Sequence, residues 1–292
     1  MSRFSERMQN NEKISTSSSS LPEFKGLMSA FNGQTGKFSL FVPGHFDQPE
    51  DVKSISFVTD FVMKRLKHRL GSGQNATTSS SNYIVGGSTT PYKITIEGTT
   101  YVGPTKKAIA DQIGRFQNGE SLSQETIYVG YLSAKNGQPM PEATPLWFVS
   151  RGTQMYNLNV ALDENGGLTA QTVIKASANG NSIVNAQGGT TQILDFKVSQ
   201  LEEDRVPKFI EWAEANGAPD WVEEYRNQMI EASEIEGSTP STAPVQSATV
   251  PAQPIQAAQP VQQAQPVQNV GMPNPFGTMG TEIEIDDSDL PF

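Results

Sequence analysis

Residues 64–69, which read Lys-Arg-Leu-Lys-His-Arg, form the densest basic group in the chain. Lysine and arginine at this density can bind the phosphate oxygens of a nucleic acid, and each neutralised phosphate releases counterions. We expect a helix from Pro49 to Leu70 that carries this group in its last turns. Because cations at the C-terminal end of a helix also interact favourably with its dipole, the same group is equally compatible with a structural role.

Aromatic side chains are the second feature that suits nucleic-acid binding, because bases stack on aromatic rings with about 1–3 kcal/mol per base whatever the sequence. In a strand expected over 145–151, Trp147 alternates with apolar neighbours and shares a face with Arg151, so we expect it to be exposed. Tyr128 similarly opposes its apolar neighbours in a strand expected over 126–132, so we expect it to be exposed as well. The alternative is that Trp147 packs beneath a loop or a helix.

Two further residues complete the candidate DNA-binding set. Tyr83 lies in a segment rich in Gly, Ser, Thr and Asn over residues 71–91, a loop that either becomes ordered on DNA or is disordered. Lys93 lies in a hairpin expected from Tyr92 to Val102. The full set is Lys64, Arg65, Lys67, Arg69, Tyr83, Lys93, Tyr128, Trp147 and Arg151.

Residues that could support catalysis are few. His45 and His68 stand apart from any metal-ligand spacing or nucleophile motif. Gly33-Gln-Thr-Gly-Lys37 looks like part of a phosphate-binding loop, but the motif needs glycine at 31 and a hydroxyl residue at 38, and both positions are Phe. Scattered acidic residues could assemble a nuclease site in three dimensions, although no pattern favours one. We therefore expect no enzymatic activity, no cofactor and no metal.

The elements that carry the candidate residues are expected to be mainly strands. From 124 to 201, apolar runs alternate with turns such as Asn136-Gly137, a dipeptide that suits tight hairpins. The expected strands cover 126–132, 145–151, 154–162, 168–176, 181–186 and 191–198. In the third of these, Tyr156 shares a face with Leu158, so we expect it in the core. The pattern predicts an antiparallel meander that closes into a barrel or a strongly bent sheet.

Helices and one further strand are expected around this meander. A first strand is expected at Lys37–Val42, and a helix from Pro104 to Gln117. After residue 201 the pattern becomes helical and acidic, with one helix over 206–215 and another from Ala218 to about 236. Because the outer face of this helical pair is negative, it would repel DNA, and any DNA-binding surface should lie elsewhere.

The net charge of −10 is distributed unevenly. Residues 1–200 contain eighteen Lys and Arg against fifteen Asp and Glu, whereas 201–236 contain eleven acids against three bases. The acidity is therefore C-terminal, and the body is weakly basic. No apolar run reaches eighteen residues and there is no cysteine, so we expect no membrane span, no disulfide and a cytoplasmic location.

The last eleven residues, 282–292, contain five carboxylates and end in Leu290, Pro291 and Phe292. Phe292 can fill an apolar pocket on a partner while its terminal carboxylate meets a basic side chain there. From Gly237 to Thr281 there is no charged residue, and Pro, Gln, Ala, Val, Ser and Thr dominate. Such a segment buries too little apolar area to fold, so we expect a disordered tether that ends in a docking peptide.

This tether and tip resemble the C-terminal tail of bacterial and phage single-stranded DNA-binding proteins, whose tip typically reads Asp-Asp-Asp-Ile-Pro-Phe. In that family the tail recruits replication, repair and recombination proteins. The resemblance covers about the last fifty residues, and Ser288 and Leu290 depart from the usual tip. It assigns partner docking to Asp286, Asp287, Asp289, Leu290, Pro291 and Phe292. It also implies an oligonucleotide-binding-type (OB-fold-like) β-barrel and a homo-oligomer.

Together these features predict an α+β protein with an antiparallel β-rich barrel and flanking helices. We expect it to bind single-stranded DNA without sequence preference and to recruit partner proteins through its tip. The alternative is a replication or transcription adaptor that captures the same partners without binding DNA. The expected parts are a disordered N-terminus (1–20), a DNA-binding domain (21–200), an acidic helical segment (201–236), a disordered linker (237–281) and a docking tip (282–292).

Overall fold

The computed structural model describes residues 22–45, 47–71, 76–116, 119–184 and 190–238. The expected N-terminal segment 1–20, the docking tip 282–292 and nearly all of the expected linker lie outside the described residues. The exception is the start of that linker, because residues 237 and 238 still belong to the last helix, α5 (Ala218–Ser238). The partner-docking residues of the tip therefore have no structural description.

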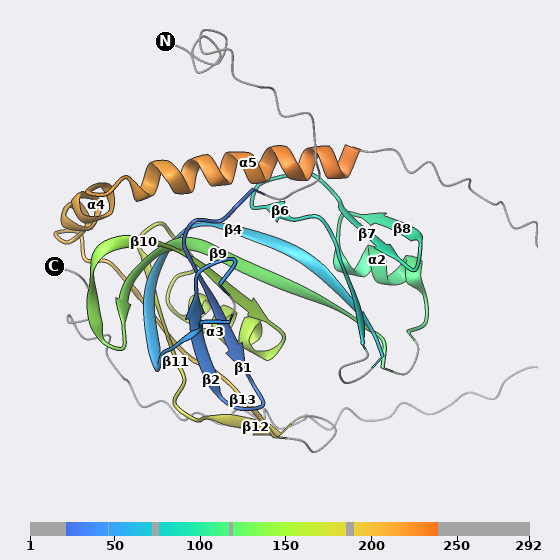
Figure 1. The fold of residues 1–292 in the computed structure, drawn as a ribbon, viewed down its shortest axis with the longest axis horizontal. Helices are drawn as coiled ribbons and strands as arrows, with labels where there is room; N and C mark the ends of the chain where they lie inside the picture. Colours follow the sequence, from blue (N-terminus) through green and yellow to red (C-terminus); the bar gives the residue numbers. More distant parts are fainter. Residues whose placement is uncertain (1–21, 46, 72–75, 117–118, 185–189, 239–292) are drawn as a thin grey trace, which may run out of the picture. The chain divides into compact units, whose positions relative to one another are not determined.

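A single ten-stranded sheet dominates the described part of the chain and curls into a half-barrel (Figure 1). Its strands follow the order β14 (Asp195–Gln200), β11 (Thr172–Ser177), β4 (Ser54–Leu70), β9 (Ser121–Lys135), β10 (Gln138–Arg151), β1 (Leu27–Asn32), β2 (Lys37–Phe41) and β3 (Glu50–Asp51). Two short strands, β5 (Thr77–Ser80) and β6 (Ile84–Val85), also pair with β4. Neighbours are antiparallel except β1 and β10, which run parallel.

The strand-rich α+β class is confirmed, but the closed OB-type barrel is not. Among the described strands the path through the sheet has two ends, β14 and β3, so the half-barrel stays open. Two separate hairpins, β7–β8 (Tyr92–Ile96 and Thr99–Gly103) and β12–β13 (Ser182–Val184 and Thr190–Gln192), complete the strands. The described helices are α2 (Lys106–Ile113), α3 (Thr153–Glu164), α4 (Val206–Glu214) and α5.

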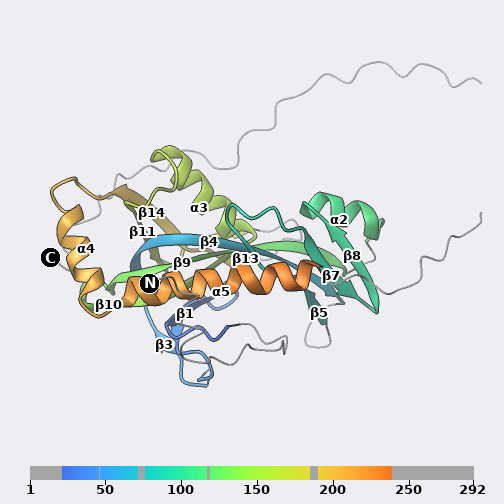
Figure 2. The ribbon, with the colours of Figure 1, turned by 90° about the horizontal axis from the view of Figure 1, so that it is seen from above.

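Both faces of the sheet are covered, and each cover has its own core (Figure 2). On one side, Met63, Val129 and Trp147 pack with Phe209 of α4 and Tyr225 of α5; we call this side the α5 face. On the other side, which we call the α3 face, a second core joins sheet residues to α3; it includes Phe57, Tyr128, Phe148, Leu158 and Leu162. The acidic helices α4 and α5 thus pack on the chain's own sheet.

The prediction of a helix from Pro49 to Leu70 is wrong, because this segment forms the long strand β4. Residues 55–59 are all buried, since β4 lies between β11 and β9 and is covered on both faces. The first half of this strand has no polar face, so residues 55–63 are nearly continuous in β-branched and aromatic residues rather than alternating. Such a run also contains apolar residues at helical spacing, which explains the error.

The prediction of a strand over 154–162 is also wrong, because these residues belong to helix α3. Leu158 and Leu162 are the buried residues of this helix, and their separation of four fits one helical face as well as it fits one face of a strand. Tyr156, expected in the core, is instead 56% exposed. By contrast, the hairpin β7–β8, helix α2, helices α4 and α5, and the turn at Asn136 and Gly137, both of which have positive φ, confirm the predictions.

Gly130 of β9 provides a test of how closely β4 and β9 approach. A Cβ atom at this position would lie 1.9 Å from the carbonyl oxygen of Val58, beside the irregularity in the β4–β9 pairing. We expect Gly130→Ala to lower the free energy of unfolding by about 1–3 kcal/mol or more, because backbone must shift. Urea unfolding measures this effect.

Ser133→Ala is the matched control for that measurement. Ser133 is on the same strand and fully buried, and its hydroxyl has no hydrogen-bond partner within the described residues. Removing an unsatisfied buried hydroxyl should be neutral or slightly stabilising. Equal losses from both variants would contradict the close approach at Gly130.

Candidate nucleic-acid interface

Three cations from β4 and β10, the two strands that flank β9, surround one carboxylate of β9 on the α5 face. Glu125 of β9 is directly opposite Arg65 of β4 and Arg151 of β10 in the sheet register. The Arg65 Nε lies 2.7 Å from Glu125 Oε2, and the Lys67 Nζ lies 3.2 Å from Oε1. The Arg151 Nη1 lies 3.4 Å from Oε1. We call these four residues the Glu125 cluster.

The cluster is positively charged overall and remains accessible to solvent. Glu125 itself is only 1% exposed. Burial raises the pKa of its carboxyl, but the charges and hydrogen bonds of Arg65 and Lys67 outweigh burial and hold that pKa below its usual value. Glu125 is therefore ionised at neutral pH, and three positive charges face one negative charge. The Arg151 side chain is 60% exposed, so the cluster can meet an anion from solution.

Two of the predicted aromatic residues lie beside this cluster, but they are buried. The Arg65 guanidinium lies 4.9 Å from the centre of the Tyr83 ring and donates a hydrogen bond to the Tyr83 hydroxyl. The Tyr83 ring lies 5.8 Å from that of Trp147. Trp147 also contacts Phe24, at 5.5 Å, and Tyr225 of α5, at 6.3 Å. These rings orient Arg65 and anchor the cluster to the core.

The prediction that Trp147 is exposed for base stacking is wrong. Its side chain is 8% exposed, because α5 and the segment around Phe24 cover this face of the sheet. The expectation that Trp147 and Arg151 share a face is confirmed, since both residues lie on the same side of β10. The expected exposure of Tyr128 is also wrong, because Tyr128 is 3% exposed within the core of the α3 face.

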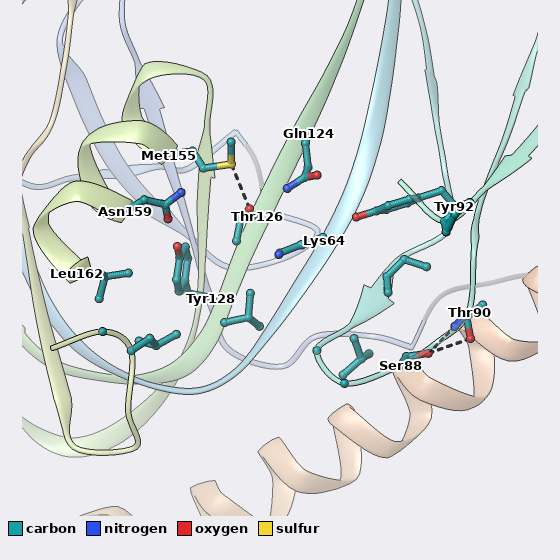
Figure 3. Close-up of a pocket in the computed structure, with 18 of the residues that line it drawn as sticks. Lys64, Ser88, Thr90, Tyr92, Gln124, Thr126, Tyr128, Met155, Asn159 and Leu162 are labelled. Carbon is teal, nitrogen blue, oxygen red and sulfur yellow. Dashed lines mark hydrogen bonds between the residues drawn. The ribbon is translucent and has the colours of Figure 1, made fainter. Parts of the chain in front are cut away.

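Lys64 lies on the α3 face, because alternate residues of a strand point to opposite faces. There it lines a groove of about 830 Å³ between β4, β9, α3 and residues 84–92, which we call the α3 groove (Figure 3). Tyr128 also lines the groove, and burial raises its pKa to about 12. Lys64 and Tyr128 are thus on the opposite side of the sheet from the Glu125 cluster.

The structure therefore brings together five of the nine predicted DNA-binding residues. Arg65, Lys67, Tyr83, Trp147 and Arg151 lie in or beside the Glu125 cluster. Arg69 is exposed near the end of β4, and Lys93 is half-buried in β7. Glu125, which organises the cluster, is absent from the predicted set. Its role depends on the pairing of β9 with β4, and no local pattern in the sequence reveals that pairing.

No protein-family model matches the chain, and no significant match was found among curated proteins or solved structures. None of the helices in the described ranges is both long and apolar enough to cross a bilayer. Within the same ranges, no group of three or more His, Cys, Asp or Glu residues is placed to hold a metal ion. The Glu125 cluster and the α3 groove are therefore two candidate sites that are identified by their geometry alone.

Proposed function

We propose that this protein binds single-stranded DNA without catalysing a reaction and recruits other proteins through its C-terminal tip. The observation that carries the proposal is the Glu125 cluster, in which β4 and β10 present three cations around one buried carboxylate of the strand between them, β9. The carboxylate and the rigid sheet hold these cations in position before any ligand arrives, which lowers the entropic cost of binding phosphate. Phosphate contacts of this kind do not depend on base sequence.

The distribution of charge supports the same proposal. Residues 1–200 are weakly basic although the whole chain is acidic. An arginine can bind a phosphate with two parallel hydrogen bonds, and Arg151 is the most exposed cation of the cluster. In this proposal the protein acts in the cytoplasm, where it protects single-stranded DNA during replication, recombination or repair.

Recruitment of partners rests on the resemblance of the tail to that of single-stranded DNA-binding proteins. Asp286, Asp287 and Asp289 would attract a basic rim on the partner, and Phe292 would fill its apolar pocket. Homo-oligomerisation, which that family usually shows, stays a prediction.

One observation favours an adaptor that captures the same partners without binding DNA. Trp147 and Tyr128, the two rings expected to stack on bases, are both buried. Base stacking contributes much of the affinity of sequence-independent strand binders, so any binding here depends more heavily on phosphate contacts. The adaptor is therefore our second candidate function.

A fluorescence-anisotropy titration of labelled oligo-dT with the full chain separates these two functions. We expect binding that weakens steeply with salt, because each phosphate contact to a single strand contributes roughly −0.7 to the slope of log K against log [salt]. The double variant Lys67→Gln/Arg151→Gln should bind on the order of tenfold more weakly at low salt, with a shallower slope.

The matched control is Lys53→Gln/Lys106→Gln, which removes two exposed lysines that lie outside the cluster. This variant has the same net charge as the cluster variant but leaves the Glu125 cluster intact. It should therefore bind oligo-dT nearly as the wild type does. An equal loss in both variants would mean that net charge alone drives binding. If the wild-type chain shows no salt-sensitive binding of oligo-dT, DNA binding is refuted and the adaptor function remains.

A further inference from the structure

The α3 groove combines one cation, uncharged polar groups and apolar walls. Lys64 and Asp163 are the charged residues that line it. Its polar side chains include Tyr92, Gln124, Thr126, Tyr128 and Asn159, and its apolar ones include Val62, Ile84, Val85, Met155, Leu162 and Leu168. A volume of about 830 Å³ lies within the usual range for small-molecule sites.

Several polar groups in the groove have no partner in the part of the protein that the structure describes. Within the described residues, Lys64 makes no ion pair or hydrogen bond, and neither do the side-chain amides of Gln124 and Asn159. The hydroxyls of Tyr92 and Tyr128 likewise lack a partner there. Figure 3 shows the Lys64 amine and the Tyr92 hydroxyl directed into the space that Thr126 and Asn159 border from the other side.

We propose that the α3 groove binds a nucleoside monophosphate unit, with its phosphate on Lys64 and its base on the α3 side. A single unpaired lysine matches one phosphate group, whereas a triphosphate needs several cations or a metal ion. The aliphatic walls suit the flat faces of a base, and this is what distinguishes a nucleotide from a sugar phosphate, which is polar all round. The amides of Gln124 and Asn159 can bind the polar edge of a base.

The groove should distinguish between bases. The rings of Tyr92 and Tyr128 are buried in the core, so the groove offers no ring face for stacking, and hydrogen bonds must hold the base. Asp163 of α3 can only accept hydrogen bonds when ionised, and the exocyclic amino groups of adenine, cytosine and guanine can donate them. Thymine has no exocyclic amino group and can donate only from its ring N3–H, so we expect dTMP to bind most weakly of the four.

This site goes beyond the proposed function, because the groove and the Glu125 cluster lie on opposite faces of the sheet. The nucleotide could be free in solution or could be one unit of a bound strand. Competition separates these sources: an oligonucleotide displaces a nucleotide from the groove only if the strand itself enters the groove.

The test is isothermal titration calorimetry of the full chain with dAMP, dCMP, dGMP and dTMP. We expect saturable binding to the wild type and at least about tenfold weaker binding to Lys64→Gln, which loses a charge-assisted contact to phosphate. Tyr92→Phe keeps the buried ring and removes only the hydroxyl, so it should weaken binding less. The matched control is Lys53→Gln, which removes an exposed lysine just before the start of β4.

Three outcomes would overturn the inference: no nucleotide binding to the wild type, equal binding to Lys64→Gln and wild type, or equal affinity for dTMP and the other three nucleotides. Unchanged nucleotide binding by Lys67→Gln/Arg151→Gln would support it, because that variant alters only the opposite face. If the wild type binds nucleotides but not oligo-dT, the nucleotide site in the groove is supported and the proposed function is refuted. If it binds oligo-dT but no nucleotide, the proposed function is supported and the nucleotide site is refuted.

Discussion

Trp147→Ala is expected to lower the free energy of unfolding by about 3–5 kcal/mol, the usual cost of removing a large buried aromatic ring. Trp147 is 8% exposed and contacts the rings of Phe24, Tyr83 and Tyr225. Its removal would leave a cavity between β10 and α5 where three other rings meet. Urea unfolding followed by circular dichroism measures the loss.

Two further variants make this result decisive. Trp147→Phe should cost much less than alanine, because it keeps a ring and also removes a buried indole N–H that has no partner among the described residues. Tyr156→Ala, at a position 56% exposed, should change stability by no more than about 0.5 kcal/mol. If Trp147→Ala instead left stability unchanged and weakened oligonucleotide binding, Trp147 would be an exposed stacking residue, contrary to the structure.

Glu125→Gln is expected to have the second large effect, a loss of about 3 kcal/mol in the free energy of unfolding at neutral pH. Removal of one partner from a buried ion pair typically costs about 3–5 kcal/mol. The low end applies because Arg151 is 60% exposed and can turn toward water. The remaining cations, Arg65, Lys67 and Arg151, would then repel one another without a counter-charge.

The pH dependence gives this prediction a sign. The pKa of Glu125 is lower in the folded protein than its usual value of 4.5. A carboxylate with a lowered folded pKa contributes stability above its unfolded pKa, and that contribution disappears as the pH falls through the folded pKa. The difference in stability between wild type and Glu125→Gln should therefore be full at pH 7 and shrink below about pH 4.5. A difference that stays constant down to pH 3 would contradict the ionised state of Glu125.

DNA binding should respond in the opposite direction to stability in this variant. Glu125→Gln removes the negative charge and keeps all three cations on the rigid sheet, so the more positive charge of the cluster should offset the loss of the carboxylate that positions them. We expect oligo-dT affinity at low salt to be retained or increased. Arg151→Gln serves as the comparison, because it removes a cation from the same cluster and should weaken binding.

Local patterns in the sequence predicted the elements that carry an unambiguous turn or periodic signal, although these elements also pack on the sheet. The β7–β8 hairpin and helices α2, α4 and α5 have clear turn or periodic signals and are confirmed. Strand β4 and helix α3 were assigned wrongly. In each case, apolar residues occur at spacings that fit both periods, and only the tertiary neighbours of the segment decide between them.

The prediction of the candidate site was limited in the same way, because local patterns do not reveal tertiary neighbours. Alternation correctly placed Trp147 and Arg151 on one face of β10, but it could not say that a helix covers that face. The sheet has a helix on each side (Figure 2). Both faces of its central strands are therefore largely buried. The position of Glu125 between Arg65 and Arg151 depends on a register between distant strands, which no window of sequence contains.

The parallel pairing of β1 with β10 has a consequence for how the chain folds. Leu27 is opposite Leu146 and Met28 is opposite Trp147, so a strand near the start of the described chain needs a partner synthesised much later. Pairings between distant segments close a large loop before they gain contacts, and they slow folding. During translation, the β1–β2 hairpin can form early. Its residues Phe38 and Leu40, which are buried in the folded protein, then stay exposed to solvent until β10 has been synthesised. During this interval the nascent chain is most prone to aggregation, and a chaperone would have its largest effect on folding yield then.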